Sequence, residues 1–293
     1  MTMNESNAFE QIGTDGELFE TSDGNSIYFY KTGNGKPPML FLHTLRTQAE
    51  FHHKLLPAFV DDYDCYVLDW PGHGRSSKNP NVAYTADYLV SRVIEFIEAN
   101  DLKNLVLIGE SIGATGVLAL AARIPDRIKS VYASNPYDDG LIIGKPAGRM
   151  VSWLGQYTAA VTKDEKRPIT KYLIGGGFYD RSRLDDKFVD LISTNATTQE
   201  NFGAAFHSVL ANQKTWHDIR RNDYPKIPKD LPVVLHYGRQ DWSSKWVRKE
   251  NEQRLGGNLK VIEQNKLGHF SFLEDPAHMI QIVKRGENSD AAL

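Results

Sequence analysis

The sequence has little cysteine, no excess of either charge and no apolar stretch that could span a membrane. Cys65 is the single cysteine among 293 residues, which excludes an internal disulfide and favours a reducing compartment. The formal net charge is −3, from 34 basic and 37 acidic residues, so no basic excess is available for nucleic acid. The most apolar long window, 104–122, contains Glu110 and three glycines and is a poor membrane span.

The N-terminal segment also lacks the features of a signal peptide. Residues 1–13 are polar and acidic, without a basic region followed by an apolar one. Hydrophobic residues make up 41% and charged residues 24% of the chain, which is ordinary for a soluble globular protein. We therefore expect a cytoplasmic protein of enzyme size without nucleic-acid or membrane partners. The sequence leaves its oligomeric state open.

Short apolar segments alternate with helix-like segments along most of the chain. A hairpin is expected within 18–31, followed by strands at 38–43, 63–69, 104–109, 128–133, 231–237 and 259–263. Helices are expected at 85–100, 112–123, 244–255 and 275–284. Strands that alternate with helices predict an α/β fold with a mostly parallel central sheet flanked by helices.

The alternation breaks between Asn135 and Lys229, where helix-like stretches occur without a convincing series of strands. About ninety residues is too long for a plain loop. We therefore predict an inserted, mostly helical cap over 136–229. It would separate a first part of the core, 1–135, from a second part, 230–293.

The segment Gly109-Glu-Ser-Ile-Gly113 has the pattern G-x-S-x-G between a predicted strand and a predicted helix. In a sharp turn of this kind, glycines two residues before and after the serine remove side chains that would collide. The Ser111 hydroxyl would project above the sheet, and the N–H of Ile112 would face a developing oxyanion. The alternative is a buried, hydrogen-bonded serine in a glycine-rich turn.

A nucleophilic serine needs a base and a carboxylate that orients the base. His269 follows the last predicted strand, and Asp241 follows the strand before it. The carboxyl ends of parallel strands form the ligand-binding edge of such sheets, and the chain order serine, acid, histidine is typical of one α/β architecture. The pattern predicts Ser111 as nucleophile, His269 as general base and Asp241 as orienting acid.

These motifs resemble the α/β-hydrolase superfamily, in the capped branch that includes esterases, carbon–carbon bond hydrolases, epoxide hydrolases and haloalkane dehalogenases. The resemblance rests on His43-Thr44, Asp69-Trp-Pro-Gly-His-Gly-Arg-Ser76, Gly109-Glu-Ser-Ile-Gly113, Gly238-Arg-Gln-Asp241 and Gly268-His269. Epoxide hydrolases and dehalogenases of this branch carry aspartate as nucleophile, so the serine here disfavours both activities. Some relatives place the acid after the strand that is expected here at 128–133, which leaves Asp138 and Asp139 as alternatives to Asp241.

The family resemblance also bears on the oxyanion hole. Relatives commonly carry His-Gly-x-Pro after the third strand, where this chain has His43-Thr-Leu-Arg46. By that match, the resemblance implies that the N–H groups of Leu45 and Ile112 are the two oxyanion donors. Threonine in place of glycine and arginine in place of proline depart from the family pattern in this loop.

Arg46 and Trp242 are candidate substrate contacts. The planar guanidinium of Arg46 would suit a carboxylate or phosphate on the substrate. Alternatively, Arg46 pairs with a core acid such as Glu110 or Asp69 and holds the loop, which is the interpretation that we favour from sequence.

The sequence thus predicts a serine hydrolase that cleaves a small or medium carboxylic ester through an acyl-enzyme on Ser111. A carbon–carbon bond hydrolase acting on a diketone or keto acid would use the same residues. A lyase or cofactor-free oxygenase with His269 as base, and a non-catalytic small-molecule receptor, are further alternatives. The sequence has neither a phosphate-binding loop nor a dinucleotide motif, and His52-His53 has no acidic or cysteine companions. We expect no cofactor and no metal.

Overall fold

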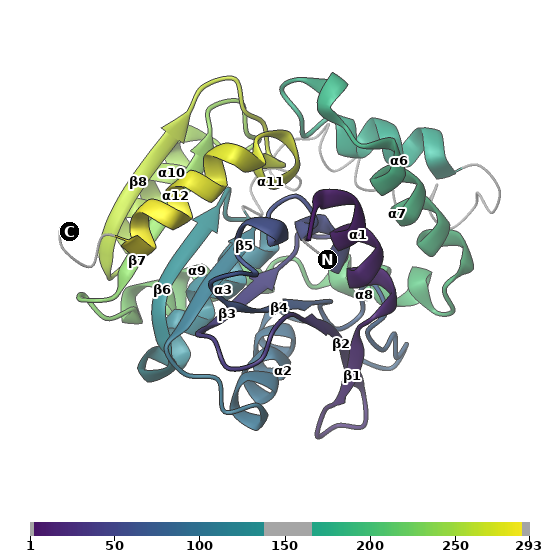
Figure 1. Cartoon of the computed structure of the whole chain (residues 1–293), viewed down its shortest axis with the longest axis horizontal. Helices are drawn as coiled ribbons and strands as arrows, with labels where there is room; N and C mark the ends of the chain where they lie inside the picture. Colours follow the sequence, from purple (N-terminus) through teal and green to yellow (C-terminus); the bar gives the residue numbers. More distant parts are fainter. Residues whose placement is uncertain (1–2, 138–165, 289–293) are drawn as a thin grey trace.

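A mostly parallel eight-stranded sheet forms the centre of the computed structural model, which describes residues 3–137 and 166–288 (Figure 1). The strand order is β1-β2-β4-β3-β5-β6-β7-β8. The strands are β1 Glu17–Glu20, β2 Ser26–Lys31, β3 Pro38–Leu42, β4 Asp64–Leu68, β5 Leu105–Glu110, β6 Ile128–Ser134, β7 Pro232–Gly238 and β8 Asn258–Gln264. β2 runs antiparallel to both of its neighbours, β1 and β4, and β3 to β8 run parallel to one another. The predicted α/β fold is confirmed.

The inner strands are apolar because both faces of the sheet are covered. Leu40 and Leu42 of β3 belong to the core on one face, whereas Met39 and Phe41 belong to the core on the other. Side chains alternate across a strand, so a continuous apolar run serves two cores at once. The edge strand β8 is more exposed and carries polar residues.

Helices and short turns cover both faces (Figure 1). The α-helices are α1 Glu5–Thr14, α2 Ala86–Ala99, α3 Ile112–Arg123, α6 Lys166–Gly175, α7 Asp186–Thr198, α8 Phe202–Ala211, α9 Thr215–Asn222, α10 Lys245–Arg254, α11 Ser271–Glu274 and α12 Pro276–Asn288. Short 3-10 turns lie at Ala49–His52, Leu56–Ala58, Pro125–Arg127, Arg181–Arg183 and Tyr224–Lys226. No helix within these described residues is long and apolar enough to cross a membrane.

Several helices begin where the sequence indicates. The hydroxyls of Thr85 and Ser244 accept backbone N–H groups at the starts of α2 and α10. Helix α1 was not predicted from the sequence, although Asn4 and Asn7 form a reciprocal capping box at its start. The apolar face of α1 packs on the sheet side that α11 and α12 also cover.

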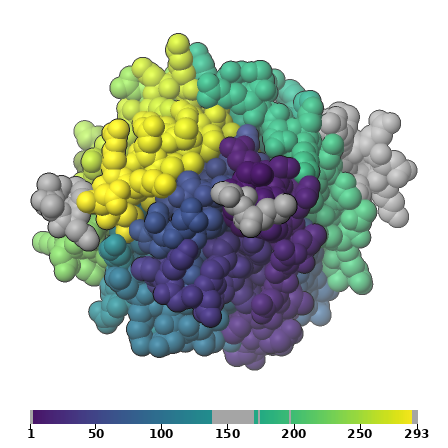
Figure 2. Space-filling view, in the orientation of Figure 1, coloured from purple at the N-terminus to yellow at the C-terminus, as the bar shows by residue number. Residues whose placement is uncertain are grey.

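The described part of the predicted cap, 166–229, consists of helices and turns without a strand. Phe188 of α7 shares a core cluster with Phe51 and residues of α1, and the α7 residue Lys187 lies 4.8 Å from the Phe9 ring. Figure 2 shows the resulting surface, where the purple N-terminal region meets the yellow C-terminal helices and the teal segment. On the other face, α9 places Trp216 edge-on to Trp70, with ring centroids 6.1 Å apart. Segment 166–229 therefore contacts both sides of the core.

Substitution of Gly113 tests whether the backbones of α3 and β3 are in close contact. A Cβ at Gly113 would overlap the backbone carbonyl of Leu42, whereas a Cβ at Gly203 in α8 would meet nothing within 4 Å. Gly113→Ala should therefore lower the free energy of unfolding by about 3 kcal/mol, since a packed backbone has little room to shift. Gly203→Ala should leave it unchanged or raise it by up to about 1 kcal/mol. Chemical denaturation measures both, and equal effects would contradict the close backbone contact.

Candidate active site

Ser111 occupies the turn between β5 and α3 in a strained backbone conformation. Its φ is 58°, a left-handed value that costs a non-glycine residue about 1–3 kcal/mol. Its N–H donates to the carbonyl of Ser134, 3.0 Å away, and its carbonyl accepts the N–H of Thr115 in α3. These bonds hold the serine at the N-terminus of α3, at the carboxyl edge of the sheet.

His269 and Asp241 form a buried hydrogen-bonded pair at the same edge. Nδ1 of His269 lies 2.5 Å from Oδ1 of Asp241, whose side chain is 1% exposed. The carboxylate also accepts the N–H and hydroxyl of Ser243, and the Arg248 guanidinium lies 3.9 Å away. An Nδ1–H that donates to Asp241 leaves Nε2 of His269 as a proton acceptor.

The charge state of Asp241 follows from these contacts. Burial alone would raise the pKa of Asp241, but the charge and hydrogen bond of His269 and the bonds from Ser243 outweigh it and lower the pKa. The carboxylate therefore stays ionised and favours a positive charge on the imidazole.

Asn135, just after β6, connects the two loops that carry this pair. Its side-chain oxygen accepts the N–H of Gly238, and its amide nitrogen donates to the carbonyl of His269 at 2.8 Å. Within residues 3–137 and 166–288, neither the Ser111 hydroxyl nor Nε2 of His269 has a hydrogen bond. Catalytic hydrogen bonds are often long before substrate binds and tighten afterwards.

A buried polar network that was not predicted from the sequence lies beneath the His269 loop. Glu110, directly before Ser111, accepts the N–H of Ser271 at 2.8 Å and also its hydroxyl. Ser271 contacts the Ser134 hydroxyl at 2.7 Å, and that hydroxyl lies 2.9 Å from Nδ1 of His236. Burial raises the pKa of Glu110 well above its usual value, despite the bonds from Ser271. The network therefore places a buried carboxyl with a raised pKa between the nucleophile turn and the histidine loop.

Ser134 and His236 make a second serine–histidine contact, but its surroundings favour a structural role. Ser134 is fully buried, and its hydroxyl already has two partners. Burial lowers the pKa of His236 to about 4, so this imidazole is a weak base. The N–H of the next residue, Asn135, donates to the carbonyl of His236 at 2.8 Å, so it is not free to bind an oxyanion.

His43 holds the loop that follows β3. Its Nδ1 lies 2.7 Å from the Thr44 carbonyl, and its Nε2 accepts the backbone N–H of Trp70 at 3.0 Å. Burial, followed by the nearby His73, lowers the pKa of His43 well below 6.5, so the ring is neutral with its proton on Nδ1. Beyond His43, the N–H groups of Leu45 and Ile112 have no acceptor among the described residues.

The acid pairing that we favoured for Arg46 is wrong. Glu110 bonds to Ser271, and the Asp69 carboxylate accepts the N–H groups of Ala49 and Arg75, both at 2.6 Å. Arg46 instead contacts the Thr170 hydroxyl at 3.4 Å, and its Nε is enclosed without a partner among the described residues. Burial lowers the pKa of this guanidinium. Its φ of 64° is also left-handed.

Trp242 stacks on His269, with ring centroids 4.4 Å apart and an interplanar angle of 19°. Its Nε1 donates to the carbonyl of Gly176, which follows α6, at 3.1 Å. A stacked indole favours a cationic imidazole. The alternative acids Asp138 and Asp139 lie outside the described residues.

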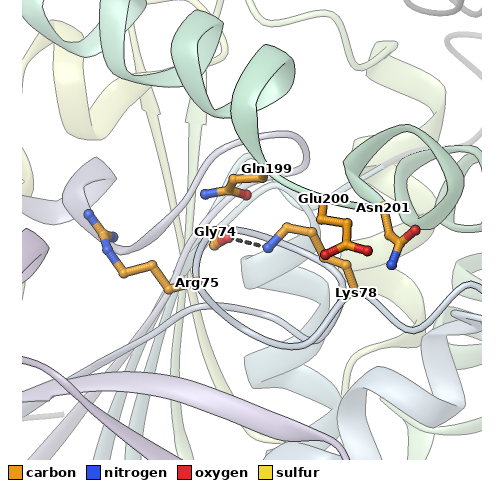
Figure 3. A pocket seen from close by; sticks show the side chains of 6 residues that line it. All are labelled: Gly74, Arg75, Lys78, Gln199, Glu200 and Asn201. Atoms are coloured by element: carbon orange, nitrogen blue, oxygen red, sulfur yellow. Dashed lines mark hydrogen bonds between the residues drawn. The ribbon is translucent and has the colours of Figure 1, made fainter.

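A surface pocket lies apart from these groups. It is lined by Gly74, Arg75, Lys78, Gln199, Glu200 and Asn201, from the turn after β4 and the α7–α8 connection (Figure 3). The figure shows the Lys78 ammonium pointing to the Gly74 carbonyl and the Arg75 guanidinium pointing away. Among the described residues, no cluster of three or more histidine, cysteine, aspartate or glutamate side chains could hold a metal.

The Asp241–His269 pair leads to a prediction for a serine-reactive probe. In Asp241→Asn, an amide N–H can donate to Nδ1 and stabilise the wrong tautomer, so labelling of Ser111 by a fluorophosphonate should slow about 10⁴-fold. Intact-mass spectrometry measures the rate, with the exposed Asp230→Asn as matched control. Unchanged labelling in Asp241→Asn would contradict its assignment and redirect it to Asp138 or Asp139.

The Glu110 carboxyl gives a pH-dependent prediction for stability. Because its pKa is raised on folding, the folded chain binds more protons than the unfolded chain above about pH 4.3, so stability falls as pH rises from there towards the folded pKa. Glu110→Gln should remove this loss, which is at most about 1.4 kcal/mol per pH unit. Denaturation of wild type, Glu110→Gln and the exposed Glu98→Gln across pH 4.5–8 measures it. Parallel curves for wild type and Glu110→Gln would show that folding does not raise the pKa of Glu110.

Known proteins share this architecture. The family profile for the alpha/beta hydrolase fold matches residues 37–276. The uncharacterized hydrolase YugF of Bacillus subtilis is 31% identical over 260 residues, which cover 86% of this chain and 90% of that protein. A bacterial membrane phospholipase A has a similar structure, with a TM-score of 0.77, 18% identity and coverage of 98% of this chain and 90% of its own. A meta-cleavage product hydrolase from Pseudomonas fluorescens has a TM-score of 0.73 and 19% identity, over 93% of this chain and 97% of its own. The chain therefore belongs to the alpha/beta hydrolase fold family.

Proposed function

We propose that this protein is a serine hydrolase that cleaves carboxylic esters of small to medium size through an acyl-enzyme on Ser111. The observation that carries the proposal is the left-handed backbone of Ser111 at the start of α3, next to the N–H of Ile112, which has no acceptor among the described residues. Strain of this kind persists only where the surrounding structure enforces it, and it is common at active sites. The buried Asp241–His269 pair at the same sheet edge supplies the matching base.

The proposed reaction begins with proton transfer from the Ser111 hydroxyl to Nε2 of His269 as the oxygen attacks the ester carbonyl. The N–H groups of Leu45 and Ile112 stabilise the oxyanion, and the dipole of α3 favours the same charge. His269 then protonates the departing alcohol, which leaves an acyl group on Ser111. Water attacks this acyl group as His269 accepts its proton, and collapse of the second intermediate releases the acid and restores Ser111.

Asp241 and Trp242 support the imidazolium that forms in both steps. The lowered pKa of Asp241 keeps a negative charge beside Nδ1, and the indole ring lies over the imidazole. Phe178 and Phe270 pack beside these rings, so the surroundings of His269 are apolar. We infer that segment 136–229 acts as a cap and that rings of this kind select an apolar acyl or alcohol group.

A carbon–carbon bond hydrolase is the second candidate. The enclosed guanidinium of Arg46 favours it, because a keto acid carries a carboxylate that a simple ester lacks. The meta-cleavage product hydrolase of similar fold carries a name of this class. A diketone and a vinylogous keto acid therefore belong in any substrate panel.

Steady-state hydrolysis of 4-nitrophenyl esters tests the proposal. Ser111→Ala and His269→Ala should each lower kcat/KM by about 10⁴-fold or more, because both groups act in the same step. The half-buried Ser91→Ala in α2, remote from the sheet edge, serves as control and should retain wild-type activity.

Three outcomes would contradict the proposal that the protein is an ester hydrolase. Turnover that survives Ser111→Ala but not His269→Ala would indicate a lyase or oxygenase with a histidine base. Turnover of the diketone or keto acid alone would indicate the carbon–carbon hydrolase. Tight ligand binding by a folded wild type that hydrolyses nothing would indicate a receptor.

A further inference from the structure

The Arg46 guanidinium has no anionic partner among the residues that the structure describes. Its Nε is shielded from solvent and has no hydrogen-bond partner there, and the one side-chain bond seen within these residues, to Thr170, is long at 3.4 Å. Within the described residues no carboxylate lies within 4 Å of it. Removing a cation from water is costly unless a partner compensates.

Two other arginines, the partly buried Arg75 and the buried Arg248, have such partners. Arg75 binds both carboxylate oxygens of Glu50, with the shorter distance at 2.5 Å. Arg248 donates to the Gly238 carbonyl and the Ser243 hydroxyl and lies 3.4 Å from Glu263. Among the described residues, Arg46 therefore differs from Arg75 and Arg248 in that it has no anionic partner.

The backbone of Arg46 is strained as well. Its φ of 64° places an ordinary side chain in the left-handed region, which costs about 1–2 kcal/mol. Glycine would adopt this conformation without strain. The loop thus holds an arginine where the backbone favours glycine, which points to a role for its side chain.

The position of Arg46 relates this side chain to the candidate site. β3 and β5 are parallel neighbours, with Leu42 opposite Gly109, so the residues that follow each strand emerge at the same edge. Arg46 is next to Leu45, whose N–H is the proposed oxyanion donor. Its guanidinium lies 5.7 Å from the Phe206 ring of α8 and contacts Thr170 of α6. It therefore lies between the oxyanion loop and the helices of segment 166–229.

We propose that Arg46 binds a carboxylate of the substrate, so that the esters or keto acids hydrolysed at Ser111 carry a free acid group. The free Nε and a terminal nitrogen form the edge of the guanidinium that matches a carboxylate in a bidentate pair, and the Thr170 hydroxyl is a third donor. One guanidinium balances one carboxylate, whereas a phosphate monoester dianion would keep an unmatched charge. This inference rests on the proposed function, because it names the substrate class of that site.

A matched pair of esters tests the inference. Mono(4-nitrophenyl) adipate and its methyl ester differ only in whether the distal carboxylate is free. The corresponding pair of glutarate esters shortens the distance between this carboxylate and the scissile ester. Wild type should hydrolyse the acid with at least tenfold higher kcat/KM. Arg46→Gln should lower kcat/KM by about 10- to 100-fold for the free-acid ester and by less than threefold for the methyl ester, as expected for the loss of a charge-assisted hydrogen bond. On the free-acid ester, Arg46→Lys should have a kcat/KM between those of wild type and Arg46→Gln, because lysine keeps the charge but cannot form the bidentate pair.

Controls separate this inference from the proposed function. The exposed Arg221→Gln has the same charge change and should behave as wild type, and thermal unfolding checks that each variant folds. Ser111→Ala should bind adipate or glutarate in calorimetry, and adding Arg46→Gln should abolish that binding. These binding measurements require no turnover.

Two results would overturn the proposed role of Arg46 without contradicting the proposed serine hydrolase activity. One is a wild type that labels at Ser111 and cleaves acid and methyl ester equally, with no selective loss in Arg46→Gln. The other is an equal loss on both esters, which would mean that Arg46 only shapes the oxyanion loop. Failure of wild-type labelling and of all ester turnover would instead contradict the proposed function.

Discussion

The backbone contact between α3 and β3 at Gly113 is the constraint on which the candidate site depends. Gly113 lies against the Leu42 carbonyl so closely that no side chain fits between them. The start of α3 is therefore pressed onto the sheet, and the chain can enter it from β5 only through a sharp turn. Ser111 takes the left-handed conformation that this turn requires. The same contact brings the N-terminus of α3 beside the loop that follows β3.

Two buried carboxyl groups near this turn have pKa values shifted in opposite directions because their partners differ. Asp241 accepts hydrogen bonds from His269 and Ser243, and these outweigh burial and lower its pKa. Glu110 has hydroxyl and amide partners from Ser271 but no cationic partner among the described residues, so burial dominates and raises its pKa. The lowered pKa of Asp241 favours a charged imidazole beside it, whereas the raised pKa of Glu110 disfavours a second negative charge beneath the nucleophile.

Much of the fold could be predicted because its determinants are local in sequence. The apolar runs of β3 to β7, the caps Thr85 and Ser244, and the placement of Ser111, Asp241 and His269 directly after strands are all visible in short windows. The helix α1 could have been found from its Asn4–Asn7 capping box and was missed.

Other parts of the site depend on long-range packing and could not be predicted. The bond from Ser271 to Glu110 joins residues 161 positions apart, and no local pattern indicates it. The sequence offered Glu110 and Asp69 as partners for Arg46, but folding engages both acids elsewhere and leaves the guanidinium enclosed between two segments. Whether a side chain such as Arg46 lacks a partner can be seen only in the folded chain, because it depends on which residues the fold brings near it.

A crystal structure of the fluorophosphonate-treated wild type tests the central claim most directly. The account predicts a covalent phosphorus–oxygen bond to Ser111, with the phosphonyl oxygen accepting the N–H groups of Leu45 and Ile112 and Nε2 of His269 facing the adduct. An unmodified Ser111, an adduct on another residue such as Ser134, or a phosphonyl oxygen directed away from both N–H groups would contradict it.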